Sequence, residues 1–272
     1  MTGLPKKHMK HSLAAKPRSP ACQLQAEYSK RRHRRHDERY FPYTEARKAV
    51  NRVPEVELMD LPLNAEAYAN ADFSEPNAKF VALFAEKFPS FDGRNVVDLG
   101  CGPADITIRL ASQYPQTTFI GVDGADAMLE IARQNILRQA SLAKRVDVRK
   151  GHIGRQGDLA GLDLFDAVVS NSLLHHLRDP LDLWRAARAL AAPKAAVLVM
   201  DLFRPQSLSE AENIVATYAC NEPEVLRRDF LNSLLAAYRP PEIAEQLRLA
   251  GVDSLRIETV SDRHLIVYGT LR

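Results

Sequence analysis

Two short segments combine glycines and carboxylates in a spacing that suits the binding of a nucleoside. The segment VVDLGCGPAD has an apolar run that ends in Asp98 and a turn that contains Gly100 and Gly102. The later segment FIGVDG has a second apolar run, which ends in Asp123. Glycines let a ligand approach the backbone, and a carboxylate about 20 residues later can accept hydrogen bonds from ribose hydroxyls. Asp123 follows Gly102 by 21 residues, so the pattern predicts a nucleoside site.

The charges around the turn indicate which nucleoside it suits. A dinucleotide-binding fold needs a glycine where this chain has Asp105, so that the helix N-terminus can approach a pyrophosphate. Here Asp98 precedes the turn and Asp105 follows it. Two carboxylates repel a pyrophosphate but attract a ligand that carries sulfonium and ammonium groups. An oxidoreductase that uses a dinucleotide is therefore the weaker alternative, and failure to bind a nicotinamide cofactor would exclude it.

These segments resemble the first two motifs of the class I S-adenosylmethionine-dependent methyltransferases. DLGCGP at residues 98–103 is similar to the first motif, and FIGVD, followed by AML, is similar to the second. FDAVVSNSLLHHL at residues 165–177 is similar to the strand-four motif of the subgroup that modifies mainly small molecules. The resemblance covers residues 77–200. It implies methyl transfer from S-adenosylmethionine to a small-molecule acceptor by a Rossmann-like α/β fold, with a mostly parallel seven-stranded sheet and helices on both faces.

The resemblance also implies which residues hold the cofactor. Gly100 and Gly102 would pass beneath its methionine part, and Asp98 would organise its amino group. Asp123, followed by Gly124, would bind the ribose hydroxyls. The remaining cofactor-binding residues that it implies are Met128 against the adenine, His152 and Ile153 near the adenine amino group, and Asn171 beside the methionine portion.

Three positions depart from the family pattern. Ala104 stands where a third glycine is usual, His152 where aspartate is commoner, and residues 192–194, Ala-Pro-Lys, replace a Pro-Gly-Gly turn. The methyl group of Ala104 is accommodated if its φ is negative. These departures leave open an alternative class, a non-catalytic module that keeps the fold and binds the cofactor without turnover. Turnover of labelled cofactor in a metabolite extract would distinguish the two.

Two histidines are the predicted catalytic residues. His175 and His176 follow the fourth strand, at the edge where open α/β sheets bind ligands, and histidine can accept a proton near neutral pH. Adjacent side chains diverge, so we expect at most one of them to face the acceptor. The alternative is that they pack against or cap the next helix, and Asp201 and His264 are weaker catalytic candidates. The three cysteines form no Cys-x-x-Cys pair, so we predict no metal site.

Strands and helices that alternate along the chain must position these residues. Such alternation is typical of a parallel sheet covered by helices. Apolar runs predict strands at 96–99, 118–122, 146–148, 165–169 and 196–200, and helical periodicity predicts helices at 106–114, 127–142 and 181–190. An earlier helix is predicted to start with Ser74 as its cap. The C-terminal part predicts helices at 207–218 and 241–250, the second ended by Gly251, and strands at 255–260 and 265–269.

These elements divide the chain into two parts, a basic arm and a methyltransferase domain. We assign the arm to residues 1–50, which are predicted to be disordered, and the domain to residues 51–272. Within the domain we predict a lid at 51–76, a cofactor-binding core at 77–200, a helical acceptor lid at 201–250 and the final strands at 251–272.

The charge of the arm suggests a second substrate class. Its 50 residues hold 13 Lys or Arg against 4 Asp or Glu, whereas the whole chain has a formal net charge of +3. The cations from Lys30 to Arg35 could hold nucleic-acid phosphates, which leaves an RNA-modifying methyltransferase as an alternative. No aromatic residue interleaves them for base stacking. Removal of the arm would abolish RNA binding but spare activity on a small acceptor.

Composition also bears on location. No apolar run approaches the roughly 18–20 residues that cross a bilayer, so we expect no membrane partner. Scattered cysteines fit a reducing compartment, and we predict a cytoplasmic protein. The acceptor atom and the oligomeric state are left open by the sequence.

Overall fold

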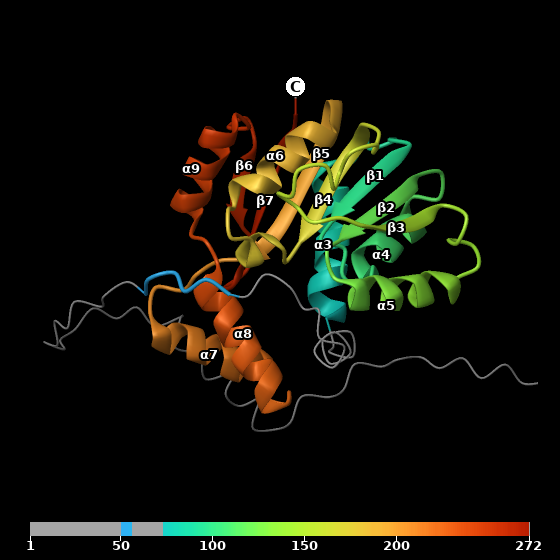
Figure 1. Cartoon of the computed structure of the whole chain (residues 1–272). Helices are drawn as coiled ribbons and strands as arrows, with labels where there is room; N and C mark the ends of the chain where they lie inside the picture. The colour runs from blue at the N-terminus through green and yellow to red at the C-terminus, as the bar shows by residue number, and fades with distance from the viewer. Residues whose placement is uncertain (1–49, 56–72, 272) are drawn as a thin grey trace, which may run out of the picture.

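A computed structural model describes residues 50–55 and 73–271, and the predicted arm and most of the predicted N-terminal lid lie outside these described residues. Figure 1 shows a central twisted sheet with helices on both of its faces. The sheet has seven strands in the order β3-β2-β1-β4-β5-β7-β6. All neighbouring pairs are parallel except β5 with β7 and β6 with β7. The predicted Rossmann-like fold is confirmed.

Six strands begin and end within two residues of the predicted positions, whereas β5 begins at Ala191, five residues before the predicted start at 196. Their bounds are β1 Asn95–Leu99, β2 Thr118–Asp123, β3 Val146–Lys150, β4 Phe165–Asn171, β5 Ala191–Leu202, β6 Arg256–Thr259 and β7 His264–Thr270. The order reverses between β1 and β4, which pair directly with Asp98 opposite Val169. In open α/β sheets, ligands bind at the carboxyl ends of the strands beside such a reversal.

The helices cover the sheet in two layers because successive strand residues point to opposite faces. Val96 packs with α3, α4 and α5, whereas Val97 packs with α6 and α9 on the other face, and Figure 1 shows the two layers. The bounds of these helices are α3 Ser74–Lys87, α4 Asp105–Gln113, α5 Asp126–Leu137, α6 Leu181–Leu190 and α9 Pro240–Ala250.

Two further helices lie beyond the carboxyl end of β5. They are α7 Leu208–Tyr218 and α8 Glu224–Ala236, and they share a small apolar cluster of their own with Leu202. Ser207 caps α7, because its hydroxyl accepts a hydrogen bond from the Glu210 amide at 3.2 Å. The helix α8 packs against the 3₁₀ turn η1 Leu174–His176, so this pair reaches the carboxyl edge of the sheet.

Three local predictions need correction. The helix α5 ends at Leu137 instead of residue 142, and the N-cap of α3 is Phe73 instead of Ser74, which is itself the first helical residue. The sequence does not predict the helix α8, because only Leu234 and Ala236 among its residues are buried and they form no apolar stripe of helical period. Gly251 ends α9 with a φ of 68°, as predicted.

In the part of the chain that the structure describes, no helix combines the length and the apolar character that crossing a membrane requires.

Candidate functional site

The first part of the site is the turn that follows β1. Gly100 and Gly102 have φ values of +72° and +51°, which glycine adopts without strain. A Cβ on Gly100 would lie 2.8 Å from the side chain of Leu173, whereas a Cβ on Gly102 would meet nothing within 4 Å. Gly100 is therefore required by the packing of the protein, and Gly102 leaves open space above the backbone.

Asp123 at the end of β2 fixes this turn. Its carboxylate accepts a hydrogen bond from the Gly102 amide at 2.8 Å and one from the Ala125 amide at 2.9 Å. Burial raises the pKa of Asp123, although backbone donors, including that of Gly124, oppose the shift. The structure thus brings together Asp98, the two glycines and Asp123, as the sequence predicts.

Asp98 lies beneath the same turn. Its side chain is buried and accepts a hydrogen bond from the Thr107 hydroxyl at 2.6 Å. Burial raises the pKa of Asp98 to about 7, the charge of Asp123 adds to the shift, and the bond from Thr107 opposes it. A carboxylate in this position has its charge stabilised when a cationic group binds beside it.

Met128, His152 and Ile153 come from the segments that follow β2 and β3. Met128 is buried in a small cluster with Ala125 at the start of α5, and Ile153 is half-buried. Asp158 accepts hydrogen bonds from both the backbone amide and Nδ1 of His152, each at 2.9 Å. Asp158 thus fixes both the backbone and the ring of His152.

Asn171 at the end of β4 has an unusual environment. Its Nδ2 donates a long hydrogen bond, 3.5 Å, to Oδ1 of Asn77, while its own buried Oδ1 has no partner among the described residues. Asn77 in turn donates to Asp105 at 2.5 Å, and Arg109 pairs with the same carboxylate at 2.8 Å. Asp105 is therefore neutralised within the protein, and Asn171 offers an acceptor atom to a ligand. We call Asp98, Gly100, Gly102, Asp123 and Asn171 the glycine-turn site.

Two departures from the family pattern adopt a backbone conformation that glycine favours. Ala104 has a φ of 64° and Lys194 has a φ of 68°. The condition of a negative φ at Ala104 is therefore not met, because the turn runs into α4 through a residue in the left-handed conformation. The turn geometry is kept in this chain at a cost of about 1–2 kcal/mol per such residue.

The second part of the site lies beside it, at the ends of β4 and β5, and contains the predicted catalytic histidines. The Asp201 carboxylate accepts a hydrogen bond from Nδ1 of His175 at 2.5 Å, and both side chains are buried. A second oxygen of Asp201 accepts the backbone amide of His175 at 3.3 Å. Since the carboxylate is an acceptor, Nδ1 of His175 carries a proton, and Nε2 is the ring nitrogen that remains for another partner.

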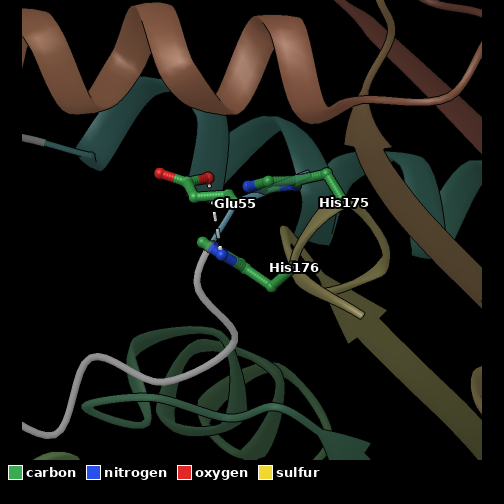
Figure 2. A group of neighbouring side chains, drawn as sticks. All are labelled: Glu55, His175 and His176. Atoms are coloured by element: carbon green, nitrogen blue, oxygen red, sulfur yellow. Dashed lines mark ion pairs between the residues drawn. The ribbon is translucent and has the colours of Figure 1, made fainter. Parts of the chain in front are cut away.

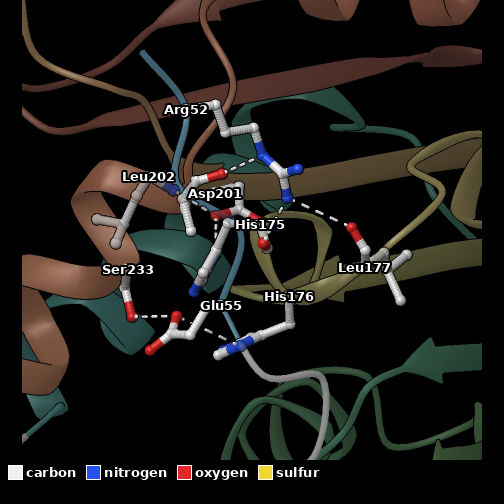
Figure 3. Close-up of polar contacts among 9 residues, drawn as sticks. Arg52, Glu55, His175, His176, Leu177, Asp201, Leu202 and Ser233 are labelled. Carbon is white, nitrogen blue, oxygen red and sulfur yellow. Dashed lines mark hydrogen bonds and ion pairs between the residues drawn. The ribbon is translucent and has the colours of Figure 1, made fainter. Parts of the chain in front are cut away.

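His176 faces the segment at residues 50–55. Its Nδ1 lies 3.6 Å from Oε2 of Glu55, and Figure 3 shows both side chains pointing into the same space as His175. Oε2 of Glu55 also accepts a hydrogen bond from the Ser233 hydroxyl on α8 at 3.0 Å. We call Glu55, His175, His176, Asp201 and Ser233 the histidine cluster.

The electrostatics of the histidine cluster separate its two rings. Burial lowers the pKa of His175, but the charge and hydrogen bond of Asp201 and the charge of Glu55 prevail, so the pKa is raised. Burial and the charge of His175 hold the pKa of His176 well below its usual value. Burial also raises the pKa of Glu55, against the effects of His175 and Ser233. His176 is therefore neutral at pH 7.

Arg52 attaches the segment at residues 50–55 to this cluster. Its guanidinium donates to the carbonyl of Ala236 at 2.6 Å and to the carbonyl of His175 at 3.1 Å, and it stacks on the ring of Tyr238 at 4.1 Å. These contacts join α8, the turn η1 and the segment that carries Glu55, as Figure 3 shows. The sequence does not predict the roles of Arg52 and Glu55 or the pairing of Asp201 with His175, because no local pattern connects residues more than 25 positions apart.

A surface hollow lies elsewhere on the molecule. It is lined by Leu164, Arg188, Ala191, Gly251 and Leu271, among others. The hollow lies where β4 and β5 begin and β7 ends, beside the C-terminal ends of α6 and α9, at the edge opposite the glycine-turn site. The hollow gathers none of the predicted site residues.

Comparison with known proteins identifies the central part of the chain. Residues 97–197 match the family model of a methyltransferase domain, and this range holds all five residues of the glycine-turn site. An uncharacterized methyltransferase of Mycobacterium tuberculosis is 24% identical over 153 residues, which are 56% of this chain and 73% of that protein. A ubiquinone biosynthesis O-methyltransferase of Nitrosospira multiformis is 27% identical over 191 residues, 66% of this chain and 74% of that protein.

A solved structure supports the same fold. The plantazolicin methyltransferase BpumL, in complex with a substrate analogue and SAH, superposes with a TM-score of 0.61. It is 12% identical in sequence, and the match covers 77% of this chain and 91% of that one. At this identity the likeness concerns the fold.

Proposed function

Because this chain belongs to the S-adenosylmethionine-dependent methyltransferases, we propose that it methylates a small molecule held between the glycine-turn site and the histidine cluster. Both groups of residues lie at the carboxyl edge of the sheet, where β1 and β4 pair beside the reversal of strand order. Two observations support the proposal: there is free space above Gly102, and the buried Oδ1 of Asn171 has no hydrogen-bond partner among the described residues.

The residues of the glycine-turn site fit S-adenosylmethionine. Gly100 and Gly102 would lie beneath its methionine part, and Asp98 and Asn171 offer acceptor oxygens for its ammonium group. Asp123 would bind the ribose hydroxyls. Around the adenine we propose Gly124, Met128, His152 and Ile153. The bound cofactor supplies an activated methyl group on a sulfonium sulfur.

The protein itself must then orient the acceptor and exclude water from the site. Orientation alone can lower the barrier by roughly 7–11 kcal/mol. The histidine cluster is proposed as the acceptor subsite, because the buried ring of His175 and the half-buried side chains of His176 and Glu55 converge there, beside the ends of β4 and β5. The helices α7 and α8 are proposed to cover it, in keeping with the predicted acceptor lid.

A small acceptor is favoured over RNA by the character of this subsite. It is lined by side chains that are mostly buried, and the segment at residues 50–55 passes across it, so the space suits a compact molecule. The relative from Nitrosospira multiformis is named for a role in ubiquinone biosynthesis, which is consistent with a small acceptor. The basic arm that motivates the RNA alternative lies outside the described residues.

A pair of glycine substitutions tests the cofactor subsite. Gly102 and Gly161 both have positive φ, and a Cβ on either would meet nothing within 4 Å. Gly102→Ala and Gly161→Ala should therefore cost similar stability, about 1–2 kcal/mol. Only Gly102→Ala should weaken the binding of S-adenosylhomocysteine, by about 10-fold or more, in isothermal titration calorimetry. Equal affinities in the two variants would sink the proposed location of the cofactor.

The acceptor class is tested by turnover. The full chain is incubated with S-adenosylmethionine labelled in its methyl group, together with a small-metabolite extract or with total RNA. We expect label in the small-metabolite fraction. Label confined to RNA would instead support the alternative that uses the basic arm, and absence of label from both would support a non-catalytic module.

A further inference from the structure

Three side chains of the histidine cluster converge without bonding to one another. Glu55, His175 and His176 each offer one ligand atom, and these atoms all lie within 4.8 Å of one another. Figure 2 shows the carboxylate of Glu55 beside both imidazole rings, whose centroids are 4.1 Å apart. They come from two distant parts of the chain, the segment at residues 50–55 and the turn η1.

The spacing is too long for hydrogen bonds. Oε2 of Glu55 and Nδ1 of His176 are 3.6 Å apart, and no hydrogen bond joins Glu55 to either ring in the described part of the chain. A tetrahedral zinc ion with bonds of about 2.0–2.2 Å holds its ligand atoms about 3.3 Å apart. The 3.6 Å between Glu55 and His176 is close to the distance between two ligands of one ion, and no pair of the three ligand atoms is more than 4.8 Å apart.

The outer contacts match those of metal ligands. A histidine that binds a metal usually donates its other ring N–H to a carboxylate, which fixes the ring, and ligating carboxylates are themselves hydrogen-bonded. Asp201 accepts the Nδ1–H of His175 at 2.5 Å, which leaves Nε2 to bind. The Ser233 hydroxyl donates to Glu55 at 3.0 Å.

The surrounding charge also favours a cation. The carboxylate of Asp201 binds the ring of His175, and that of Glu55 lies 3.6 Å from Nδ1 of His176, while Arg52 is the cation that contacts the backbone beside them. The guanidinium of Arg52 is turned away to the carbonyls of Ala236 and Leu177, so it does not fill the space between the three side chains. Two carboxylates and one guanidinium leave a net negative charge around this space, which favours a cation there.

We propose that Glu55, Nε2 of His175 and Nδ1 of His176 bind one divalent transition-metal ion of the zinc class, with a fourth position open to the acceptor. Two histidines and one glutamate, with one open position, form a ligand set of catalytic zinc sites. This inference rests on the proposed function, because the acceptor subsite is the same cluster. It replaces the prediction from sequence that the site holds no metal, which considered paired cysteines only.

The ion would define the acceptor as a molecule with a hydroxyl or thiol group. Such an ion lowers the pKa of an oxygen or sulfur acid that it binds, so the acceptor loses its proton to solvent at neutral pH. The acceptor anion then forms a bond to the methyl carbon while the bond from that carbon to the sulfonium sulfur breaks. S-adenosylhomocysteine leaves, and neither histidine has to accept a proton.

Cobalt titration of the full chain tests the site. The protein is stripped with a chelator and titrated with Co²⁺, which absorbs strongly in the visible range when its ligands are tetrahedral. We expect an absorption band that saturates at one equivalent and is displaced by Zn²⁺. Glu55→Gln and His176→Asn should each abolish this band. Asp201→Asn and Ser233→Ala should weaken Co²⁺ affinity by about 10–100-fold.

The control is a second histidine–aspartate pair. His152 and Asp158 are joined at 2.9 Å outside the cluster, so His152→Asn should leave the band unchanged. The four histidines of the arm are common to all of these variants and cannot produce a difference between them. Circular dichroism verifies that each variant is folded.

The outcomes decide between the proposals. A band that persists in Glu55→Gln and His176→Asn, or no band in the folded wild-type protein, would overturn the metal site. Binding of S-adenosylhomocysteine is measured on the same samples. Intact cofactor binding without a cobalt band removes the metal site alone, whereas a cobalt band without cofactor binding removes the proposed methyl transfer.

Discussion

The glycine-turn site and the histidine cluster occupy the same edge of one sheet but are assembled in different ways. The glycine-turn site is built mainly from 26 consecutive residues, Asp98 to Asp123, whose backbone amides and carboxylates bind one another. The histidine cluster joins Glu55, the turn η1, the end of β5 and Ser233 on α8. The first is local and depends on backbone conformation. The second depends on side chains that only tertiary packing brings together.

The difference predicts that the two groups respond to substitution in separate ways. Changes in the glycine-turn site should alter the affinity for the nucleoside, and changes in the histidine cluster should alter stability and acceptor turnover.

The largest effect is expected when the buried pair of the cluster is broken. His175→Ala leaves the buried carboxylate of Asp201 without its partner and should lower the free energy of unfolding by about 3–5 kcal/mol. His152→Ala breaks the pair with Asp158, whose side chains are each 25% exposed, and should cost about 1 kcal/mol or less. Urea denaturation of both variants measures the contrast. Equal losses would mean that burial does not distinguish the two pairs.

The next effect concerns the nucleoside. Asp123→Ala should weaken the binding of S-adenosylhomocysteine by about 100-fold, since charge-assisted hydrogen bonds contribute about 1.5–3 kcal/mol each. His176→Asn should change this affinity by less than about 2-fold, because its ring lies in the other group. Calorimetry measures both, with thermal unfolding as a check that the turn is intact in Asp123→Ala. A large effect of His176→Asn on the nucleoside would contradict the separation of the two groups.

A smaller effect is expected at Arg52, which holds the two parts of the cluster together. Arg52→Lys loses the planar fork that binds the carbonyls of Ala236 and His175, and should lower the free energy of unfolding by about 1–3 kcal/mol. It should reduce acceptor turnover and leave the affinity for S-adenosylhomocysteine unchanged. Arg185→Lys is the control, because Arg185 makes its ion pairs at the surface. Unchanged turnover in Arg52→Lys would show that the segment at residues 50–55 is not needed to position Glu55.

The smallest effect is a pH dependence of the glycine-turn site. The pKa of Asp98 is about 7, so its side chain is mostly neutral at pH 6 and mostly ionised at pH 8. Only the ionised form attracts an ammonium group, and the affinity for S-adenosylhomocysteine should therefore rise about 10-fold between these pH values. Asp98→Asn should remove this rise. A flat calorimetric profile for the wild-type protein would contradict the role of Asp98.

The same shift has a consequence for stability with a definite sign. Asp98 has a higher pKa in the folded protein than in the unfolded chain, where it is near 3.8. The folded protein therefore binds this proton more tightly, and the contribution of Asp98 to stability falls as the pH rises from about 4 to 7. Asp98→Asn should lack this loss, and urea denaturation across that range measures it.

The comparison also explains how much of the molecule could be predicted from sequence. The seven strands and the position of the glycine-turn site follow from apolar runs, glycines and a carboxylate, all of which are local signals. His175 and His176 were found because they directly follow β4. Glu55 could not be found, since its partner His176 is 121 positions away and their contact exists only after α8 and Arg52 pack.

The backbone conformation of some single residues could not be predicted from their side chains. Ala104 and Lys194 adopt left-handed backbone conformations where their side chains favour others, because the turns around them impose φ. The helix α8 lacks a strong apolar stripe, since its buried residues are few and the rest face outward. In each case the surrounding structure overrides the preference of the local sequence.

The antiparallel strand β7 has a practical consequence. Because it runs opposite to β5, it carries the chain end back to where β5 begins: the Leu271 amide donates to the Ala195 carbonyl at 3.1 Å. The C-terminus thus emerges at the far side of the sheet from both groups of residues, as Figure 1 shows. An affinity tag or surface tether attached there would lie away from the glycine-turn site and the histidine cluster, whereas residues 50–55 pass directly beside the histidine cluster.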